Sequence, residues 1–283
     1  MATFFNQATL SYSGGTVNSN ITTGEILEVL AATKTAVYDR YAPGSDITYA
    51  VNIVNSGTIA FTGLTVTDNL GAYAFGTTTL QPLDYVDGSI RYFVDGVLQP
   101  APTVTAGPPL VISGINVPAG GTATILYAAR ANTFAPQDVE GTIVNTVTIS
   151  GGGITPLTAT ETVSAEAEPR LTITKSVSPT TVTENGQLTY TFVIQNTGNV
   201  LADATDAVVV TDTFDPILTG LTVTYNGAPW TSPASYTYNE ATGLFSTAVG
   251  SITVPAATYT QDPTTGAWVV DPGVAVLTVT GTI

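Results

Sequence analysis

The chain is predicted to be all-β and to fold as two tandem immunoglobulin-like antiparallel β-sandwiches. Its 283 residues suffice for about two domains with separate cores. Short runs rich in Thr, Val, Ile and Tyr alternate between polar and apolar residues, and Gly, Pro and Asn turns separate them. No convincing stretch repeats every 3.6 residues, so short strands with turn signals favour a Greek-key sandwich in each half.

An internal repeat supports this division. Residues 30–70 read "LAATKTAVYDRYAPGSDITYAVNIVNSGTIAFTGLTVTDNL", and residues 171–214 read "LTITKSVSPTTVTENGQLTYTFVIQNTGNVLADATDAVVVTDTF". The landmarks match in order: Lys34 with Lys175, Tyr49 with Tyr190, Asn55 with Asn196, Gly57 with Gly198, and Asp68 with Asp212. The interval from Gly to Asp is 11 residues in the first copy and 14 in the second, a three-residue insertion. We expect a first domain over 26–165, a second over 166–283 and a separate N-terminal segment over 1–25.

The second copy is predicted to lack its final strands. The first copy continues with "GTIVNTVTISGGGITPLTATETVSA", whereas the second reaches "VAVLTVTGTI" at the last residues of the sequence. The opening segment, "FFNQATLSYSGGTVNSNITTGEILEVL", matches what is lacking. In this alignment Asn6 corresponds to Asn145, and the distances to the next lysine are similar, 34 − 6 = 28 and 175 − 145 = 30.

A sandwich without its last strands exposes apolar core and unpaired backbone, so another strand is expected to fill the gap. The N-terminal segment of another copy fits this place, as in donor-strand complementation. Donor and acceptor then lie at opposite ends of the chain, which produces an open fibre unless a ring closes. The alternative is that the N-terminal strand folds back onto the second domain or pairs with the first. The predicted donor residues are Phe4, Asn6, Ala8, Leu10 and Tyr12.

Polar residues in the repeat point toward apolar faces. The chain has two lysines, and both occupy the same repeat position. Strand alternation places each of these lysines, the matching aspartates and the matching asparagines among Val, Leu and Ile neighbours. Burial favours the uncharged forms of an amine and a carboxyl, and a neutral amine is a nucleophile. Two sets are therefore candidates for a Lys–Asn isopeptide bond assisted by an aspartate: Lys34, Asn145 and Asp68 within the first domain, and Lys175, Asp212 and the partner subunit's Asn6 between copies. The alternative uses the same residues as a buried Lys–Asp ion pair with no reaction.

Composition excludes several functions. Six Lys and Arg against 21 Asp and Glu give a net charge of −15, so no basic surface is available for nucleic acid. The absence of His and Cys removes the commonest general base, the thiolate nucleophile, the usual zinc ligands and any disulfide. We therefore expect no enzyme turnover, no metal and no cofactor. No apolar run is long enough to cross a bilayer, and the N-terminus shows no signal peptide, which together with Met1 favours a protein that never uses one.

Each repeat contains the same motif: Lys, then Tyr-x-Phe/Val-x-Ile-x-Asn-x-Gly, then Val-Thr-Asp. This motif resembles the bacterial surface-protein repeat called domain of unknown function 11, and its two copies cover almost the whole chain. This resemblance implies immunoglobulin-like sandwiches in surface proteins, with internal isopeptide bonds. A chain of this size also resembles clostridial spore-appendage subunits. That resemblance implies a spore-surface location and release by mother-cell lysis, without a signal peptide.

The sequence therefore predicts a structural subunit that assembles with itself, head to tail, into an extracellular or spore-surface filament. A monomeric surface adhesin, or a module that binds a carbohydrate or a protein, is the alternative. An enzyme is the third and weakest reading, because no carboxylate pair stands out from turns and solvated surface.

Overall fold

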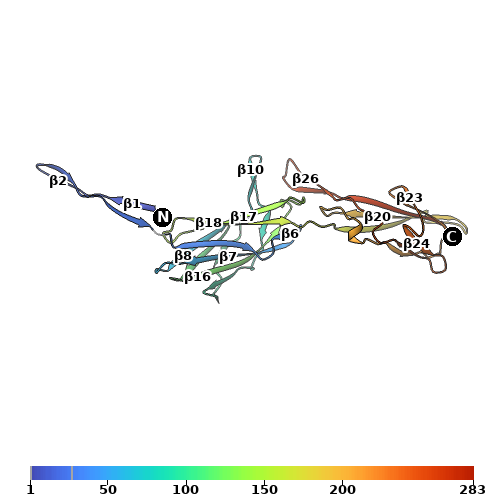
Figure 1. Cartoon of the computed structure of the whole chain (residues 1–283), viewed down its shortest axis with the longest axis horizontal. Helices are drawn as coiled ribbons and strands as arrows, with labels where there is room; N and C mark the ends of the chain where they lie inside the picture. The colour runs from blue at the N-terminus through green and yellow to red at the C-terminus, as the bar shows by residue number, and fades with distance from the viewer. Residues whose placement is uncertain (1, 27) are drawn as a thin grey trace.

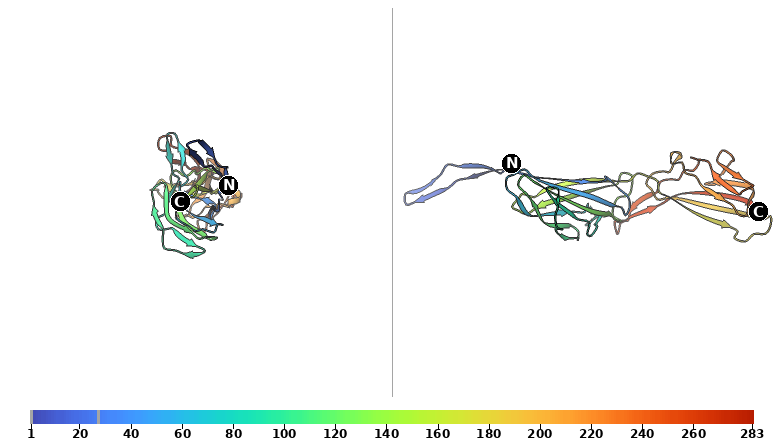
Figure 2. Two further views of the ribbon diagram at one scale, coloured as in Figure 1. Left: turned by 90° about the vertical axis from the view of Figure 1, so that its left-hand side faces the viewer. Right: turned by 90° about the horizontal axis from the view of Figure 1, so that it is seen from below.

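The computed structural model describes residues 2–26 and 28–283. Two β-sandwich units follow an N-terminal extension, and together they make an elongated molecule (Figures 1 and 2). The buried apolar residues form two separate clusters, one between Tyr41 and Ala165 and the other between Leu188 and Val279. The predicted all-β class with two sandwiches is confirmed.

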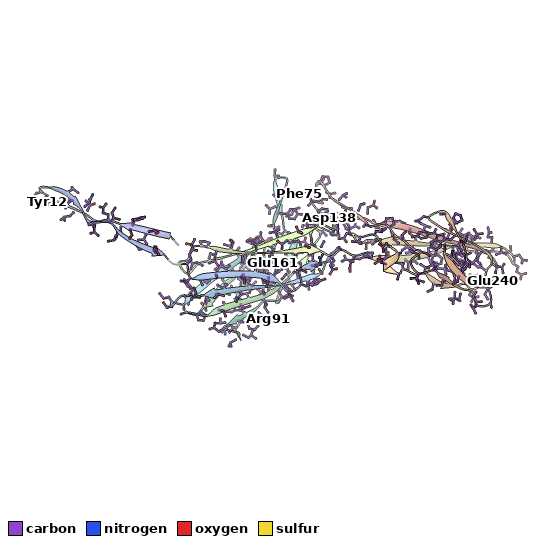
Figure 3. All side chains as sticks on the ribbon, viewed as in Figure 1. Tyr12, Phe75, Arg91, Asp138, Glu161 and Glu240 are labelled. Carbon is purple, nitrogen blue, oxygen red and sulfur yellow. The ribbon has the colours of Figure 1, made fainter. Side chains whose placement is uncertain are left out.

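The N-terminal extension is a long β-hairpin that projects away from the first unit (Figure 1). Tyr12 lies near its tip (Figure 3). The outer part pairs β2 with β3, and the inner part pairs β1 with β4. Within the described residues these strands pair only with each other, so neither of the two fold-back arrangements is seen. The strands are β1 Ala2–Asn6, β2 Thr9–Tyr12, β3 Gly15–Asn18 and β4 Thr22–Ile26.

The first unit packs two six-stranded sheets face to face around the first apolar cluster. One pair departs from the expected antiparallel pattern, because β18 pairs in parallel with the short β6. One sheet contains β13 Val97–Leu98, β12 Arg91–Val94, β16 Thr122–Ala131, β7 Asp46–Asn55 and β5 Leu30–Ala36, with β11 Leu83–Tyr85 beside β16. The other contains β14 Thr103–Thr105, β15 Leu110–Val117, β8 Phe61–Asp68, β17 Thr142–Ser150, β18 Leu157–Ala165 and β6 Arg40–Tyr41.

The second unit repeats this plan with a smaller second sheet. Its larger sheet contains β19 Leu171–Ser178, β20 Gln187–Asn196, β28 Gly273–Thr282, β22 Thr219–Tyr225 and β23 Ala228–Trp230. Its smaller sheet contains β21 Thr211–Thr213, β25 Leu244–Thr247 and β24 Tyr236–Asn239. The three-residue insertion coincides with a 3-10 turn, η1 Ala204–Asp206, which the side chain of Asp203 caps.

Strand order and register show which elements correspond. Lys34 lies opposite Val51 in the β5–β7 pair, and Lys175 lies opposite Phe192 in the β19–β20 pair. By position, β21 corresponds to β8 and β25 to β15. In the first unit β8 lies between β15 and β17, whereas among the described residues of the second unit β21 pairs with β25 alone. The second unit therefore has no described counterpart of β17 and β18.

The two units contact each other through hydrogen bonds and two hairpins. The Asn199 side chain donates to the backbone oxygens of Gln137 at 3.1 Å and Glu166 at 2.8 Å. The hairpin of β9 Tyr73–Phe75 and β10 Thr78–Leu80 lies near the hairpin of β26 Thr258–Gln261 and β27 Trp268–Asp271 (Figure 1). The Gln261 side chain donates to the Tyr73 hydroxyl at 2.9 Å. These contacts tie the second unit to the end of the first.

The Asn-x-Gly landmark of each repeat is a structural turn. Asn55 is buried and donates to the carbonyls of Ile59 and Pro118, both at 2.8 Å, while its Oδ1 accepts the Gly57 N–H at 2.9 Å. The buried Asn196 likewise accepts the N–H of Gly198. The landmark thus satisfies backbone groups at the turn in both units.

Replacing Asn55 with Ala is expected to lower the free energy of unfolding of the first unit by about 1–3 kcal/mol, because several buried backbone groups lose their partners. Urea denaturation measures the change. Asn52→Ala is the control, since the half-buried Asn52 side chain accepts a single described hydrogen bond, from the Thr124 hydroxyl. Equal losses for the two variants would contradict the structural role.

Candidate functional site

The first unit brings three of the predicted residues together in its core. Lys34 comes from β5 in one sheet, Asp68 from the end of β8 in the other, and Asn145 from β17. The Lys34 Nζ donates to Asp68 Oδ2 at 2.8 Å, and neither side chain is exposed. The Asn145 Nδ2 lies 3.5 Å from the same Oδ2, at the limit of hydrogen-bond distance. The carboxylate therefore lies between the amine and the carboxamide.

Backbone groups and a tyrosine fix the orientation of these side chains. Asp68 Oδ1 accepts the Leu70 N–H at 2.7 Å, and Asn145 Oδ1 accepts the Gly71 N–H at 3.2 Å. The Tyr127 hydroxyl donates to Asp68 Oδ2. Burial, followed by the nearby Asp68 charge, raises the pKa of Tyr127 well above its ordinary value, so this hydroxyl keeps its proton.

The amine itself sits in an apolar environment. Its Nζ lies 4.6 Å from the Tyr49 ring centroid and 5.8 Å from that of Tyr127. Desolvation lowers the pKa of Lys34 to about 8, although Asp68 opposes that shift. Lys34 therefore loses its proton more readily than an exposed lysine, and the neutral amine is a nucleophile.

The second unit reproduces half of this arrangement. Lys175 on β19 pairs with Asp212 on β21, and its Nζ lies 4.5 Å from the Tyr190 ring centroid and 5.4 Å from that of Phe214. The surroundings differ in exposure, since the Lys175 side chain is 40% exposed and that of Lys34 is fully buried. Neighbouring Ile173 on the same strand is 52% exposed. Among residues 2–26 and 28–283, no strand of the chain covers the face that β17 and β18 cover in the first unit.

The predicted third member of the second set lies elsewhere in the chain. Asn6 ends β1 in the N-terminal hairpin, at the opposite end of the molecule from the second unit (Figure 1). The other predicted donor residues belong to the same hairpin: Phe4 in β1, Ala8 between strands, and Leu10 and Tyr12 in β2. Phe4, Leu10 and Tyr12 are 53%, 64% and 60% exposed.

Tyr127 belongs to the cluster around Asp68, and the sequence reasoning missed it. It faces Tyr49 across the β16–β7 pair, and the equivalent of Tyr49, Tyr190, faces Val279 across the β20–β28 pair. The hydroxyl is thus present in one copy only and does not appear as a repeat landmark. The alternation of Ile125, Tyr127 and Ala129 was the one available signal that this side chain points inward.

Among residues 2–26 and 28–283 no group of His, Cys, Asp and Glu is arranged to hold a metal ion. In the same residues no helix is long and apolar enough to cross a membrane.

Comparisons with known proteins show similarity at the level of the fold. No family model and no curated protein matches the chain. The fold is similar to the major pilin subunit BcpA of Bacillus cereus, with 11% identity, 96% of this chain and 73% of that chain covered, and a TM-score of 0.36. It is also similar to the pilus backbone protein RrgB of Streptococcus pneumoniae, with 13% identity, 86% of this chain and 55% of that chain covered, and a TM-score of 0.36. The chain thus spans about half of that RrgB structure. The resemblance to domain of unknown function 11 remains a prediction.

The difference in burial predicts different costs for losing each lysine. Lys34→Met leaves Asp68 buried without its ion-pair partner and is expected to lower the free energy of unfolding by about 3–5 kcal/mol or more. Lys175→Met, at a partly exposed pair, is expected to cost less than about 1 kcal/mol. Urea denaturation of chains that lack residues 1–23 and carry Asn145→Ala measures both losses without contributions from assembly or from a Lys34–Asn145 bond. Similar losses in the two variants would show that the two sites do not differ as described.

Proposed function

We propose that this protein is the structural subunit of a surface filament, in which the N-terminal segment of each copy completes the second unit of its neighbour. The observation that carries the proposal is the open face around Lys175 and Asp212, whose counterpart in the first unit is covered. In this proposal residues 1–25 are the donor segment, and residues 26–165 and 166–283 form the two folded domains.

The first unit shows what a covered face contains. Strand β17 pairs with β8, with Val147 opposite Asp68 and Ile149 opposite Val66. Its inward residues Ile143, Asn145, Val147 and Ile149 are buried. By the sequence alignment their counterparts in the N-terminal segment are Phe4, Asn6, Ala8 and Leu10. Burial of Phe4 and Leu10 in the acceptor would contribute about 1–2 kcal/mol each, because both side chains are already partly covered in the free hairpin.

The second unit offers the matching edge. Strand β21 pairs with β25 on one side, and the described residues place no strand on its other side. Such an edge is a template for another strand. Because the donor hairpin and the acceptor edge lie at opposite ends of an elongated chain, each copy can bind two others, and the contact repeats into an open filament.

Isopeptide formation would make both sites covalent. A proton passes from Lys34 Nζ to Asp68, and the neutral Nζ attacks Cγ of Asn145. The new C–N bond forms as the bond from Cγ to Nδ2 breaks. Nδ2 leaves as ammonia, which carries the two protons of Nδ2 and a third that came from Nζ through the Asp68 carboxyl. Of the other two protons of Nζ, one stays on the new amide and one stays on Asp68. The packed core holds the reacting groups together, which supplies much of the acceleration. Lys175, Asp212 and the partner subunit's Asn6 would react in the same way.

The remaining properties agree with a homopolymer at an extracellular surface. With a charge of −15 and only two lysines, both in the proposed sites, the chain has no basic surface for nucleic acid. The spore surface is the location that the resemblance to spore-appendage subunits implies. The reaction occurs once per site, so the protein is not an enzyme in the sense of turnover.

The first bond predicts a mass deficit in the monomer. A chain lacking residues 1–23 is expected to weigh less than its sequence mass by one ammonia, and tandem mass spectrometry should identify Lys34 joined to Asn145. Asn145→Ala in the same background should restore the full mass, and Lys175→Ala should not. A full sequence mass in the folded parent chain would support the unreacted ion pair instead.

The second bond predicts a ladder of polymers that survives boiling in SDS. Cross-linked peptides from the ladder should contain Asn6 joined to Lys175. Asn6→Ala should leave filaments visible by electron microscopy but abolish the ladder, whereas Asn20→Ala, an asparagine in the same hairpin, should preserve both. Deletion of residues 1–23 should abolish filaments. Filaments from the chain lacking residues 1–23 would contradict the donor-strand mechanism. A full-length chain that stays a monodisperse monomer would favour the binding-module alternative.

A further inference from the structure

The N-terminal extension has two arms, and the pairing of its inner part, β1 with β4, matches the hairpin that closes the first unit. In the extension Asn6 lies opposite Thr22, and in the first unit Asn145 lies opposite Glu161. Both pairs are separated by 16 residues, 22 − 6 and 161 − 145. The alignment that matches Asn6 with Asn145 therefore matches the second arm, β4, with β18 in the same register.

Side-chain sizes also correspond across the two arms. In the first unit Ile143 lies opposite Val163, and both are buried. In the extension Phe4 lies opposite Gly24, and a Cβ on Gly24 would clash with the Phe4 ring. A large and a small residue thus replace two of intermediate size. Phe4 and Gly24 together occupy a volume comparable to that of Ile143 and Val163. Because core packing leaves few voids, this match favours the entry of both arms into the same core.

The first unit shows the place of the second arm. Strand β18 pairs with β17 on one side and, through Ser164 opposite Arg40, in parallel with β6 on the other. It also lies next to β5, the strand that carries Lys34. In the second unit the corresponding strand β19 is exposed over nearly its whole length, including Leu171, Ile173 and Lys175. A single strand beside β21 would leave this part of the face uncovered.

We infer that the donor is the whole hairpin: β1 and β2 lie beside β21 of the neighbouring copy, while β3 and β4 lie against its β19. This inference rests on the proposed head-to-tail assembly and names the surface that the assembly uses. The occupant is a second copy of this chain, because the register and the residue sizes both belong to its own N-terminus.

Specific contacts follow from the correspondence. Lys34 and Tyr49 are each 141 residues before their counterparts Lys175 and Tyr190, so Arg40 corresponds to Thr181. Ser164 corresponds to Glu25 in the register of the two hairpins. Glu25 of one copy is therefore placed opposite Thr181 of the next. In the other arm, the pairing of Thr148 with Thr67 places Thr9 opposite Thr211.

The second arm also changes the charge at the site. Glu161 lies opposite Asn145. Its charge, like that of Asp68, raises the pKa of Lys34 and partly opposes the effect of desolvation. Thr22 takes its place in the extension, so the donated hairpin brings no carboxylate to that position. Asp212 then remains the acidic partner of Lys175.

Cysteine cross-linking in the full chain tests the placement, because the native sequence contains no cysteine. Two variants with one cysteine each, Glu25→Cys and Thr181→Cys, are co-expressed and oxidised, so that a disulfide joining the two positions can form only between copies. Non-reducing peptide mass spectrometry is expected to find the linked peptide and to lose it on reduction. Thr9→Cys with Thr211→Cys reports the first arm in the same way. Glu25→Cys with Ala228→Cys, on the opposite edge strand β23, is the matched control.

The outcomes separate the two proposals. Disulfides for both arms, with none for the control pair, support the two-stranded donor. A disulfide for Thr9 and Thr211 alone overturns the inference about the second arm and leaves donor-strand assembly standing. The absence of both disulfides contradicts the head-to-tail assembly itself. A disulfide for the control pair at the level of the Glu25–Thr181 pair would show random collision and would also overturn the inference.

Discussion

A buried ammonium in a β-sandwich requires a carboxylate beside it and strands that cover it from solvent. The two units differ mainly in how they meet this requirement. In the first unit Asp68 supplies the charge, and the β17–β18 hairpin supplies the cover. Without that cover the same pair is solvated, as the 40% exposure of the Lys175 side chain shows. Because desolvation is what weakens the hold of the amine on its proton, covering the second site would change its chemistry as well as its stability. Assembly and reactivity would then be coupled, and Lys175 would acquire an environment like that of Lys34 only after a neighbour had docked.

The two sites are related without being identical. The Tyr127 hydroxyl that binds Asp68 is replaced by the apolar Val279, and Phe214 contributes an aromatic ring close to Lys175. In addition, the η1 insertion precedes β21, which shortens the regular part of the acceptor edge compared with β8. A short edge strand is less prone to unspecific pairing. In the proposed assembly the second site would accept an external hairpin, whereas the first site is closed by its own β17–β18 hairpin.

The inward residues could be predicted from the sequence because successive side chains of a strand point to opposite faces. That rule places Lys34, Asp68 and Asn145 in one core independently of the loop conformations. Other features depend on which layers are present, and alternation cannot reveal them. Lys175 has the same strand pattern as Lys34, yet its exposure is decided by the absence of a covering hairpin among the described residues. Tyr127 was missed because repeat comparison finds only what both copies share. The second arm of the extension was missed because polar Thr22 and Gly24 lack the apolar pattern of an inward face, and only the observed pairing with Asn6 and Phe4 reveals their correspondence with β18.

The folded state of the free extension bears on how a filament of this kind would grow. Exposed Phe4 and Leu10 would make an isolated strand prone to aggregation, but pairing of β1 with β4 and of β2 with β3 satisfies much of the backbone before any partner arrives. Preorganisation also lowers the conformational entropy lost on docking, since β1 and β4 already have the register of β17 and β18. The cost that remains is desolvation of Asn6 and of the Lys175–Asp212 pair, and an isopeptide bond would offset it by making the docked state irreversible. In the proposed assembly the polar cluster would fix the register of docking, while the apolar residues on either side of Asn6 would supply the attraction.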